Sequence, residues 1–187
     1  MSEHTRLLGQ VPAALKDLRE AAERIQEGDI TQPVREIAPL TLRVQQLSMQ
    51  CTQQFHDLSR SQYAVMTGGP ENLAHLAGAC AQVSLAATLC NLAIHHRTES
   101  LLYEDADPTP NTSREQLRRA GDEMQRAATT YRALARLLSR RLASAAARHE
   151  DQQLITHARA NGSDKKSGAA APTPAGLAPK PVTRTRH

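Results

Sequence analysis

The sequence predicts an all-α protein, an antiparallel four-helix bundle followed by a disordered basic C-terminal tail. Three observations lead to this fold class. Residues 72–96 form a run of 25 residues without Asp, Glu, Lys or Arg, in a chain of which 22% is charged. Aromatic residues make up only 2% of the chain, so small aliphatic side chains must build the core, which suits packed helices. No stretch shows the sustained apolar and polar alternation that predicts a strand.

The uncharged run is the segment about which we expect the other helices to gather. At 100° per residue it has two apolar stripes, and a helix that is apolar nearly all round lies inside a larger protein or a bilayer. Its length allows a membrane span. Polar side chains recur about every turn, however, and each would cost several kcal/mol in hydrocarbon without a partner. We therefore expect a soluble core helix, with the second stripe available to another copy in a homo-oligomer: Leu85, Leu89 and Leu92.

Two helices are predicted before this segment. The first runs from Val11 or Pro12 to Glu27, with the proline in its first turn and Gly28 as the stop signal. The second runs over residues 36–66, where apolar side chains recur at spacings of three and four. The members of this seam are Leu40, Val44, Leu47, Cys51, Phe55, Leu58 and Val65.

The third helix is expected to end near Tyr103, and the acidic stretch 104–110 follows as a loop. The fourth helix is expected to span about residues 113–148, with a later end at Ala160 as the alternative. Thr112 and Glu115 have the spacing of a capping box, which predicts its start. Its apolar side carries Leu117, Met124, Tyr131, Leu134, Leu138, Leu142 and Ala145.

The charge of the chain divides it into two regions. Residues 1–160, the predicted bundle, carry 18 basic side chains (17 Arg and Lys16) and 18 acidic ones, so they sum to zero. Residues 161–187 carry three Lys and two Arg against one Asp, which accounts for the net charge of +4. This region is rich in Ala, Pro, Gly, Ser and Thr, so it cannot bury enough apolar area to offset its ordering entropy. We predict a disordered tail.

The sequence holds no recognisable catalytic motif, and we expect a protein that is not an enzyme and binds no cofactor. It has no phosphate-binding Gly-rich loop, GxSxG elbow, HExxH or EF-hand pattern. The closest approach to a metal-ligand set is His95, His96 and Glu99, which we interpret as a polar helix end. Three cysteines lie within apolar patterns, as buried free thiols do, and their odd number predicts a reducing cytoplasm: Cys51, Cys80 and Cys90.

Residues 11–34 contain a proline-started amphipathic helix that ends in Gly28-Asp29-Ile30. In this the segment resembles the first helix and connector of HAMP signalling modules. The resemblance implies a signalling module linked to a membrane helix. The acidic-Ile-Gly signature that begins the second HAMP helix is replaced here by Glu36-Ile37-Ala38-Pro39, and no membrane helix precedes the segment.

The arginines of the fourth helix form the sharpest pattern in the chain. All nine arginines from Arg114 to Arg148 fall within the half-turn opposite its apolar side, and residues 124–148 contain six Arg and no acid. One interpretation, which we favour, is a solvated side paired with the acidic loop and with helix-one acids (Asp17, Glu20, Glu23 and Glu27). The other is a surface for phosphates or acidic proteins, since Arg binds both bidentately. Its candidate residues are Arg118, Arg126, Arg132, Arg136 and Arg140.

Two functions are compatible with these patterns. The first is a non-enzymatic cytoplasmic bundle that acts through protein–protein interaction in a regulatory or scaffold role and associates with itself. The second is a nucleic-acid-associated accessory protein that binds phosphates through the arginine face and the basic tail. The lack of stacking aromatics disfavours the second. The sequence identifies no particular partner.

Overall fold

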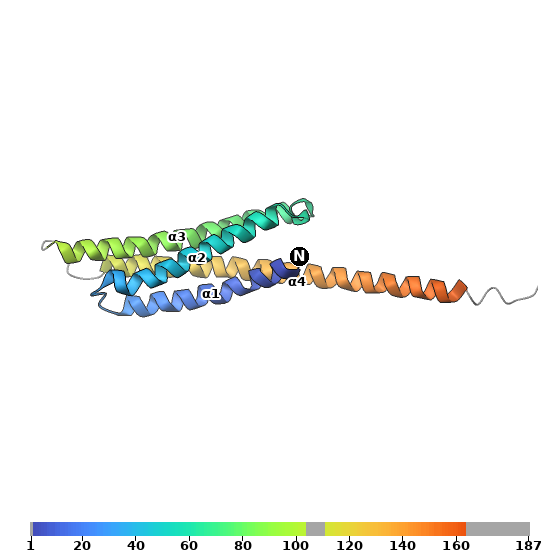
Figure 1. The fold of residues 1–187 in the computed structure, drawn as a ribbon, viewed down its shortest axis with the longest axis horizontal. Helices are drawn as coiled ribbons and strands as arrows, with labels where there is room; N and C mark the ends of the chain where they lie inside the picture. Colours follow the sequence, from blue (N-terminus) through green and yellow to red (C-terminus); the bar gives the residue numbers. More distant parts are fainter. Residues whose placement is uncertain (1, 104–110, 164–187) are drawn as a thin grey trace, which may run out of the picture. The chain divides into compact units, whose positions relative to one another are not determined.

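The structure, a computed structural model, describes residues 2–103 and 111–163, and this part of the chain is all-helical (Figure 1). Four α-helices follow in order, α1 (Ser2–Glu27), α2 (Pro33–Ser59), α3 (Gly69–Leu102) and α4 (Asn111–Ser163), with a short 3-10 helix, η1 (Gln62–Val65), between α2 and α3. The chain divides into two compact units, Met1–Ser144 and Ala145–His187. The predicted all-α class is confirmed.

One hydrophobic core in the first unit takes side chains from all four helices. Leu15 of α1, Val44 of α2, Val83 of α3 and Met124 of α4 are all almost completely buried in it. The uncharged segment supplies α3 with small buried residues, which allow neighbouring helices to approach closely. Buried small or thiol side chains on α3 are Ala79, Cys80, Ala86, Ala87, Cys90 and Ala93.

Helix α1 begins nine residues earlier than Val11, so Pro12 lies inside the helix and not in its first turn. The reason is packing, because Leu8 and Val11 are buried and extend the apolar spacing toward the N-terminus. The predicted end is correct. The helix stops at Glu27, and the Gly28 N–H donates to the Ile25 carbonyl oxygen at 3.1 Å.

Helix α2 ends at Ser59, seven residues before the predicted end. The Ser61 hydroxyl accepts a hydrogen bond from the Tyr63 N–H at 3.2 Å and so caps η1, a local side-chain bond that competes with helix continuation. In η1 the Tyr63 side chain is buried, whereas Val65 is 87% exposed. The prediction that Val65 belongs to the apolar seam of this helix is therefore wrong.

Helix α4 begins at Asn111, and the predicted capping box does not form. The Glu115 carboxylate accepts two hydrogen bonds from the Arg118 guanidinium, at 2.7 and 2.8 Å, instead of reaching back to the helix start. The buried Ser113 hydroxyl donates to the Ala93 carbonyl oxygen of α3 at 2.9 Å. A tertiary contact thus fixes this helix start against α3.

The second unit continues α4 to Ser163, past the predicted boundary at residue 160, and the described side chains from 145 to 157 are exposed. Of the side chains predicted on the apolar side of this helix, Ala145 is exposed and Leu142 is half-buried. The remainder of the predicted tail, residues 164–187, lies outside the described residues, as does the predicted acidic loop 104–110.

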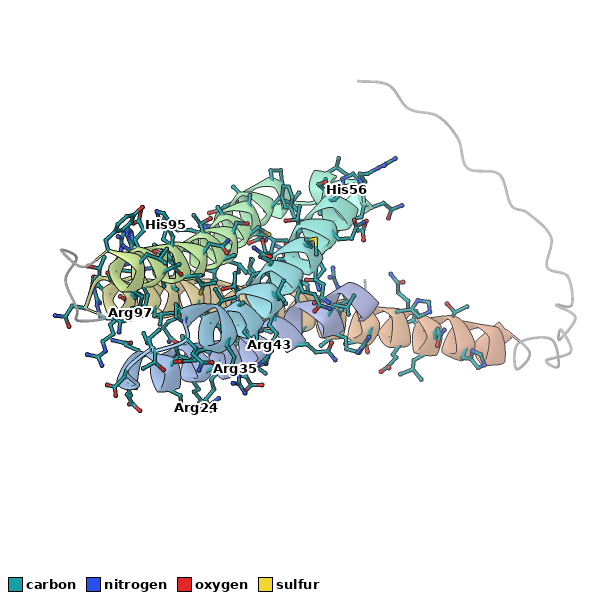
Figure 2. All side chains as sticks on the ribbon, turned by 60° about the vertical axis from the view of Figure 1, so that its left-hand side comes forward. Arg24, Arg35, Arg43, His56, His95 and Arg97 are labelled. Atoms are coloured by element: carbon teal, nitrogen blue, oxygen red, sulfur yellow. The ribbon has the colours of Figure 1, made fainter. Side chains whose placement is uncertain are left out.

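Two arginines hold the connection between α1 and α2. Arg97 is the buried guanidinium of α3, and its Nε donates to the Ile30 carbonyl oxygen at 2.9 Å while Nη2 donates to that of Asp29 at 3.3 Å (Figure 2). Arg114 of α4 donates to the Gly28 carbonyl oxygen at 2.8 Å. Ile30 itself has a positive φ of 49°, a costly backbone conformation for a β-branched residue. The arginines therefore stabilise a strained corner.

Replacing Arg97 by Met is expected to lower the free energy of unfolding by about 2 kcal/mol. Methionine keeps an apolar stem but leaves the carbonyls of Asp29 and Ile30 without their donor. Urea denaturation followed by circular dichroism measures the change. Arg24→Met, at an exposed position, is the matched control and is expected to change stability by less than about 0.5 kcal/mol. Equal effects of the two substitutions would contradict the assigned role of Arg97.

Candidate functional site

The predicted arginine face divides into two parts. In the first part each arginine has a carboxylate partner within α4. Arg118 contacts Glu115 and Asp122 at 2.7 and 2.9 Å, and Arg126 contacts Glu123 at 2.7 Å. Hydrogen bonds from Arg118 lower the pKa of the Glu115 carboxyl, and the same contact raises the pKa of Arg118. The charges of Arg118 and Arg126 are thus compensated, and these two residues carry little net attraction for a ligand.

The second part of the face consists of Arg132, Arg136 and Arg140. Within residues 2–103 and 111–163, no carboxylate lies within ion-pair distance of Arg132, Arg136 or Arg140. Two of the helix-one acids that we expected on this side pair within α1 instead, Glu20 with Lys16 at 3.6 Å and Glu23 with Arg19 at 3.6 Å. The predicted pairing of helix-one acids with the arginine face is wrong for these three arginines.

These three arginines line an open groove between α1 and α4, with a volume of about 600 Å³. We call it the α1–α4 groove. Its lining is more apolar than polar and contains no carboxylate side chain. The residues that line it are Gly9, Pro12, Ala13 and Lys16 of α1 and Arg132, Ala135, Arg136, Ser139 and Arg140 of α4.

Helix α1 supplies a shallow floor because its residues at the groove are small. A Cβ added to Gly9 would meet no heavy atom within 4 Å, so the space beside this glycine is open. Leu8, Val11 and Leu15 point into the core instead. Sequence reasoning identified the arginines but missed this floor. The sequence shows that Gly9, Pro12 and Ala13 are small. That they lie opposite the arginines follows only from the way α1 packs beside α4.

The arginine row has an electrostatic reason to bind an anion. At 1.5 Å per residue, Arg132, Arg136 and Arg140 rise along about 12 Å of one helix face. Like charges at i,i+4 destabilise a helix by a few tenths of a kcal/mol per pair. An anion in the groove would offset this repulsion, and guanidinium groups bind carboxylates and phosphates bidentately.

A second groove, of about 430 Å³ between α1 and α2, provides a comparison. Arg24 and Arg43 line it, and Arg35 lies nearby on α2 (Figure 2). Glu36 also lines it, and one Glu36 carboxylate oxygen accepts the Gln32 N–H at 2.8 Å. Because a carboxylate is already present there, this groove is a weaker anion site than the α1–α4 groove.

The predicted oligomer stripe is only partly available. Leu85 and Leu92 are 44% and 37% exposed on the outer face of α3, but Leu89 is 3% exposed and belongs to the core. The assignment of Leu89 to a free stripe is therefore wrong, because a neighbouring helix covers that side of α3. The role of Leu85 and Leu92 in self-association stays a prediction.

The three cysteines are buried free thiols, as predicted. The Tyr131 hydroxyl lies 3.3 Å from the Cys80 Sγ and also interacts with the Cys51 thiol, so α2, α3 and α4 meet in a small polar contact inside the core. Burial raises the pKa of Cys51 to about 11, that of Cys90 to about 12, and that of Tyr131. Thiolates are the nucleophilic form, so these side chains are poor nucleophiles at neutral pH.

The histidine cluster at the end of α3 is a surface ion pair. The His95 Nε2 and His96 Nδ1 atoms lie 3.4 and 3.9 Å from one Glu99 carboxylate oxygen. Among the residues that the structure describes, no group of three or more His, Cys, Asp or Glu side chains is placed to hold a metal ion.

Helix α3 is the one described helix that is long and apolar enough to cross a membrane. Length and composition are the only support for such a span, because the core helix of a soluble protein passes the same test. The side of α3 that carries Leu76, Val83 and Ala93 packs in the core. The soluble, cytoplasmic interpretation stays a prediction.

No protein-family model, curated protein or solved structure matches the chain. The likeness of residues 11–34 to HAMP modules therefore stays an expectation from the sequence.

Proposed function

We propose that the chain is a non-enzymatic helical-bundle protein that acts through protein–protein interaction, in a regulatory or scaffold role in the cytoplasm. In this proposal the first unit is an antiparallel four-helix bundle, and the α1–α4 groove binds an acidic segment of a partner. Short connections between α1 and α2 and between α2 and α3 support the antiparallel arrangement, since short loops join antiparallel neighbours.

One observation carries the proposal: three arginines that have no carboxylate partner among the described residues line a groove whose floor is formed by small, mostly apolar residues. A partner segment that presents carboxylates together with small apolar side chains would satisfy both parts of the groove. Exposed ion pairs are each worth less than about 1 kcal/mol, so binding would need several of them together with contact to the floor. The expected interaction is therefore moderate in affinity and sensitive to salt.

The second candidate function is association with nucleic acid. The row Arg132, Arg136 and Arg140 favours it, because guanidinium groups bind phosphates as well as carboxylates. The apolar floor of the groove favours the protein partner, since a phosphate backbone offers nothing apolar to cover Pro12 and Ala13.

The triple substitution of Arg132, Arg136 and Arg140 by Gln is expected to weaken binding of an acidic peptide at least about tenfold. The probe is a fluorescein-labelled peptide of Glu and Ala, about 14 residues long. Fluorescence anisotropy at about 50 mM and about 200 mM salt measures the affinity, with a labelled DNA duplex as the second probe.

The matched control is the triple substitution of Arg24, Arg35 and Arg43 by Gln, which removes the same charge from the α1–α2 side. It is expected to leave peptide binding within about twofold of the wild type. Duplex binding that exceeds peptide binding, and is lost with the groove arginines, would establish the nucleic-acid function instead. If neither probe binds at the lower salt concentration, the groove has no such function.

A further inference from the structure

We infer that two copies of this chain dimerise through the outer surface of α2 and α3, with α2 of each copy packed against α3 of the other. Four large apolar side chains are exposed on this surface, Leu42 and Met49 of α2 and Leu85 and Leu92 of α3. We call it the α2–α3 face. It shares no residue with the α1–α4 groove, so the inference goes beyond the proposed function and does not depend on it.

The four side chains share one face because of the way α2 and α3 align. The two helices run side by side in opposite directions (Figure 1), and the Ser48 and Ser84 hydroxyl oxygens face each other at 2.7 Å. The two apolar residues of α2 lie about 100–120° around the helix from Ser48. Those of α3 lie about 80–100° around from Ser84, in the same rotational sense. In antiparallel helices, similar rotations place side chains on the same side of the pair.

The same alignment sorts the apolar side chains into two rows. Met49 and Leu85 each follow the serine of their own helix, so they lie at the same level to within about 3 Å. Leu42 lies about 9 Å and Leu92 about 12 Å from the level of the serines, in the same direction along the pair. Each row therefore contains one side chain from α2 and one from α3.

This arrangement is complementary to a second copy of itself. A two-fold axis that runs along the middle of the face, parallel to the helices, places α2 of one copy over α3 of the other. Each row then meets the same row of the partner, so Met49 contacts the partner's Leu85, and Leu42 contacts the partner's Leu92. The packed helices are antiparallel, as in a four-helix bundle. Such an isologous contact closes with two copies.

The centre of the face carries no charge. Residues 44–56 of α2 and 72–96 of α3 contain no Asp, Glu, Lys or Arg, although 22% of the chain is charged. Depletion of charged residues is the compositional mark of the buried centre of an interface. A charged protein surface or a nucleic acid would form no ion pair there, whereas a second copy presents the same uncharged face.

The face is large enough for a stable dimer. The two helices lie side by side for about 35 Å and are together about 20 Å wide. This gives about 700 Å² in projection, close to the area of about 800 Å² that each partner buries in a standard interface. A second copy can cover the whole face.

Sedimentation velocity of the full chain tests the dimer. At about 20 µM chain we expect mostly dimer, both at about 50 mM and at about 500 mM salt, because the face has no charges to screen. Met49→Lys is expected to weaken dimerisation about a hundredfold, because the dimer would bury the new charge twice. Leu85→Glu is expected to act in the same way. The matched control is Val65→Lys, at an 87% exposed position outside the face, which is expected to leave the dimer unchanged.

An equimolar mixture of Met49→Lys and Leu85→Glu tests the pairing of the rows. One contact of the mixed dimer joins the new lysine to the new glutamate, and the other keeps Leu85 against the partner's Met49. The dissociation constant is therefore expected to return to within about tenfold of the wild type. A mixture of Leu42→Lys and Leu85→Glu is the control. It is expected to stay monomeric, because these positions lie in different rows.

Circular dichroism first confirms that each variant is as helical as the wild type, which we expect because the substituted side chains are exposed. A wild-type chain that is monomeric at about 100 µM would overturn the inference. So would a dimer that persists in both single variants, or two mixtures that behave alike. A monomer that floats with phosphatidylcholine vesicles, and loses this binding with Met49→Lys, would show that the face binds lipid instead of a second copy.

Two cross-checks separate this inference from the proposed function. The variant with Gln at Arg132, Arg136 and Arg140 is expected to dimerise like the wild type. Met49→Lys is expected to bind the labelled Glu and Ala peptide like the wild type. Loss of the dimer alone would leave the groove function standing, and loss of peptide binding alone would leave the dimer standing.

Discussion

Between pH 8 and pH 11 the free energy of unfolding is expected to fall by about 5 kcal/mol from the Cys51 and Cys90 thiols alone. The cause is burial, which raises their folded-state pKa from 9.0 to about 11 and about 12. A buried thiol keeps its proton at a pH where the unfolded chain has lost it, so the unfolded state gains stability as the pH rises. The contribution is complete below pH 9 and disappears as the pH passes the folded-state values.

This loss is comparable with the whole stability of a small domain, about 5–15 kcal/mol. Burial also raises the pKa of Cys80 and Tyr131, so both act in the same direction. Few other side chains before residue 165 change their protonation between pH 8 and pH 11. Lys16 is the one lysine in that part of the chain, and arginine does not titrate in this range.

Urea denaturation at a series of pH values from 8 to 11, in the presence of a phosphine reductant, measures the effect. Cys90→Ala is the control, because it removes one titrating thiol and is expected to reduce the loss of stability by about 2–3 kcal/mol. A urea midpoint that stays constant over this pH range would show that the thiols are accessible to solvent in the folded protein.

Gly69→Ala is expected to lower the free energy of unfolding by about 3 kcal/mol. A Cβ at Gly69 would overlap the carbonyl oxygen of Tyr63, and overlap with backbone cannot be relieved by a side-chain rotation. The same carbonyl accepts the Met66 N–H at 3.2 Å, and the Gly69 N–H donates to the Met66 carbonyl oxygen at 2.7 Å. Relief of the clash would therefore displace η1 and expose Tyr63, which is 2% exposed in the native protein.

Gly78→Ala is the matched control in the same helix. A Cβ at Gly78 meets nothing within 4 Å, so the alanine adds helix propensity without a clash and is expected to stabilise the protein by about 0.5–1 kcal/mol. Thermal or urea denaturation of the two variants compares them. If Gly69→Ala were as stable as Gly78→Ala, the close approach of η1 to the start of α3 would be wrong.

The fold class could be predicted from the sequence because it depends on periodic patterns. The apolar spacing of α2 and the uncharged run of α3 are local properties, and both helices are present. Local signals failed where another contact, within the same helix or between helices, competes with them. Thr112 and Glu115 have capping-box spacing, but Arg118 takes the Glu115 carboxylate. Leu89 falls on a second stripe of α3, but a neighbouring helix covers it.

The candidate site was predictable only in part, for the same reason. Periodicity put Arg132, Arg136 and Arg140 on one line of α4. Whether their charges are compensated depends on which side chains of α1 lie opposite them. The sequence of either helix alone does not determine how the two helices align. Arg97 was missed because a single arginine at the end of an apolar helix is typical of a solvent-exposed terminus. Its carbonyl partners lie 67 and 68 residues away in the chain.

Lys16 has a practical consequence for the study of the groove. It is the only lysine in the first 164 residues, and it lines the groove. Reagents or enzymes that acylate lysine side chains have a single target in this part of the chain. The extent of acylation at that position, read by mass spectrometry of one proteolytic fragment, would report directly whether a ligand shields the groove in living cells.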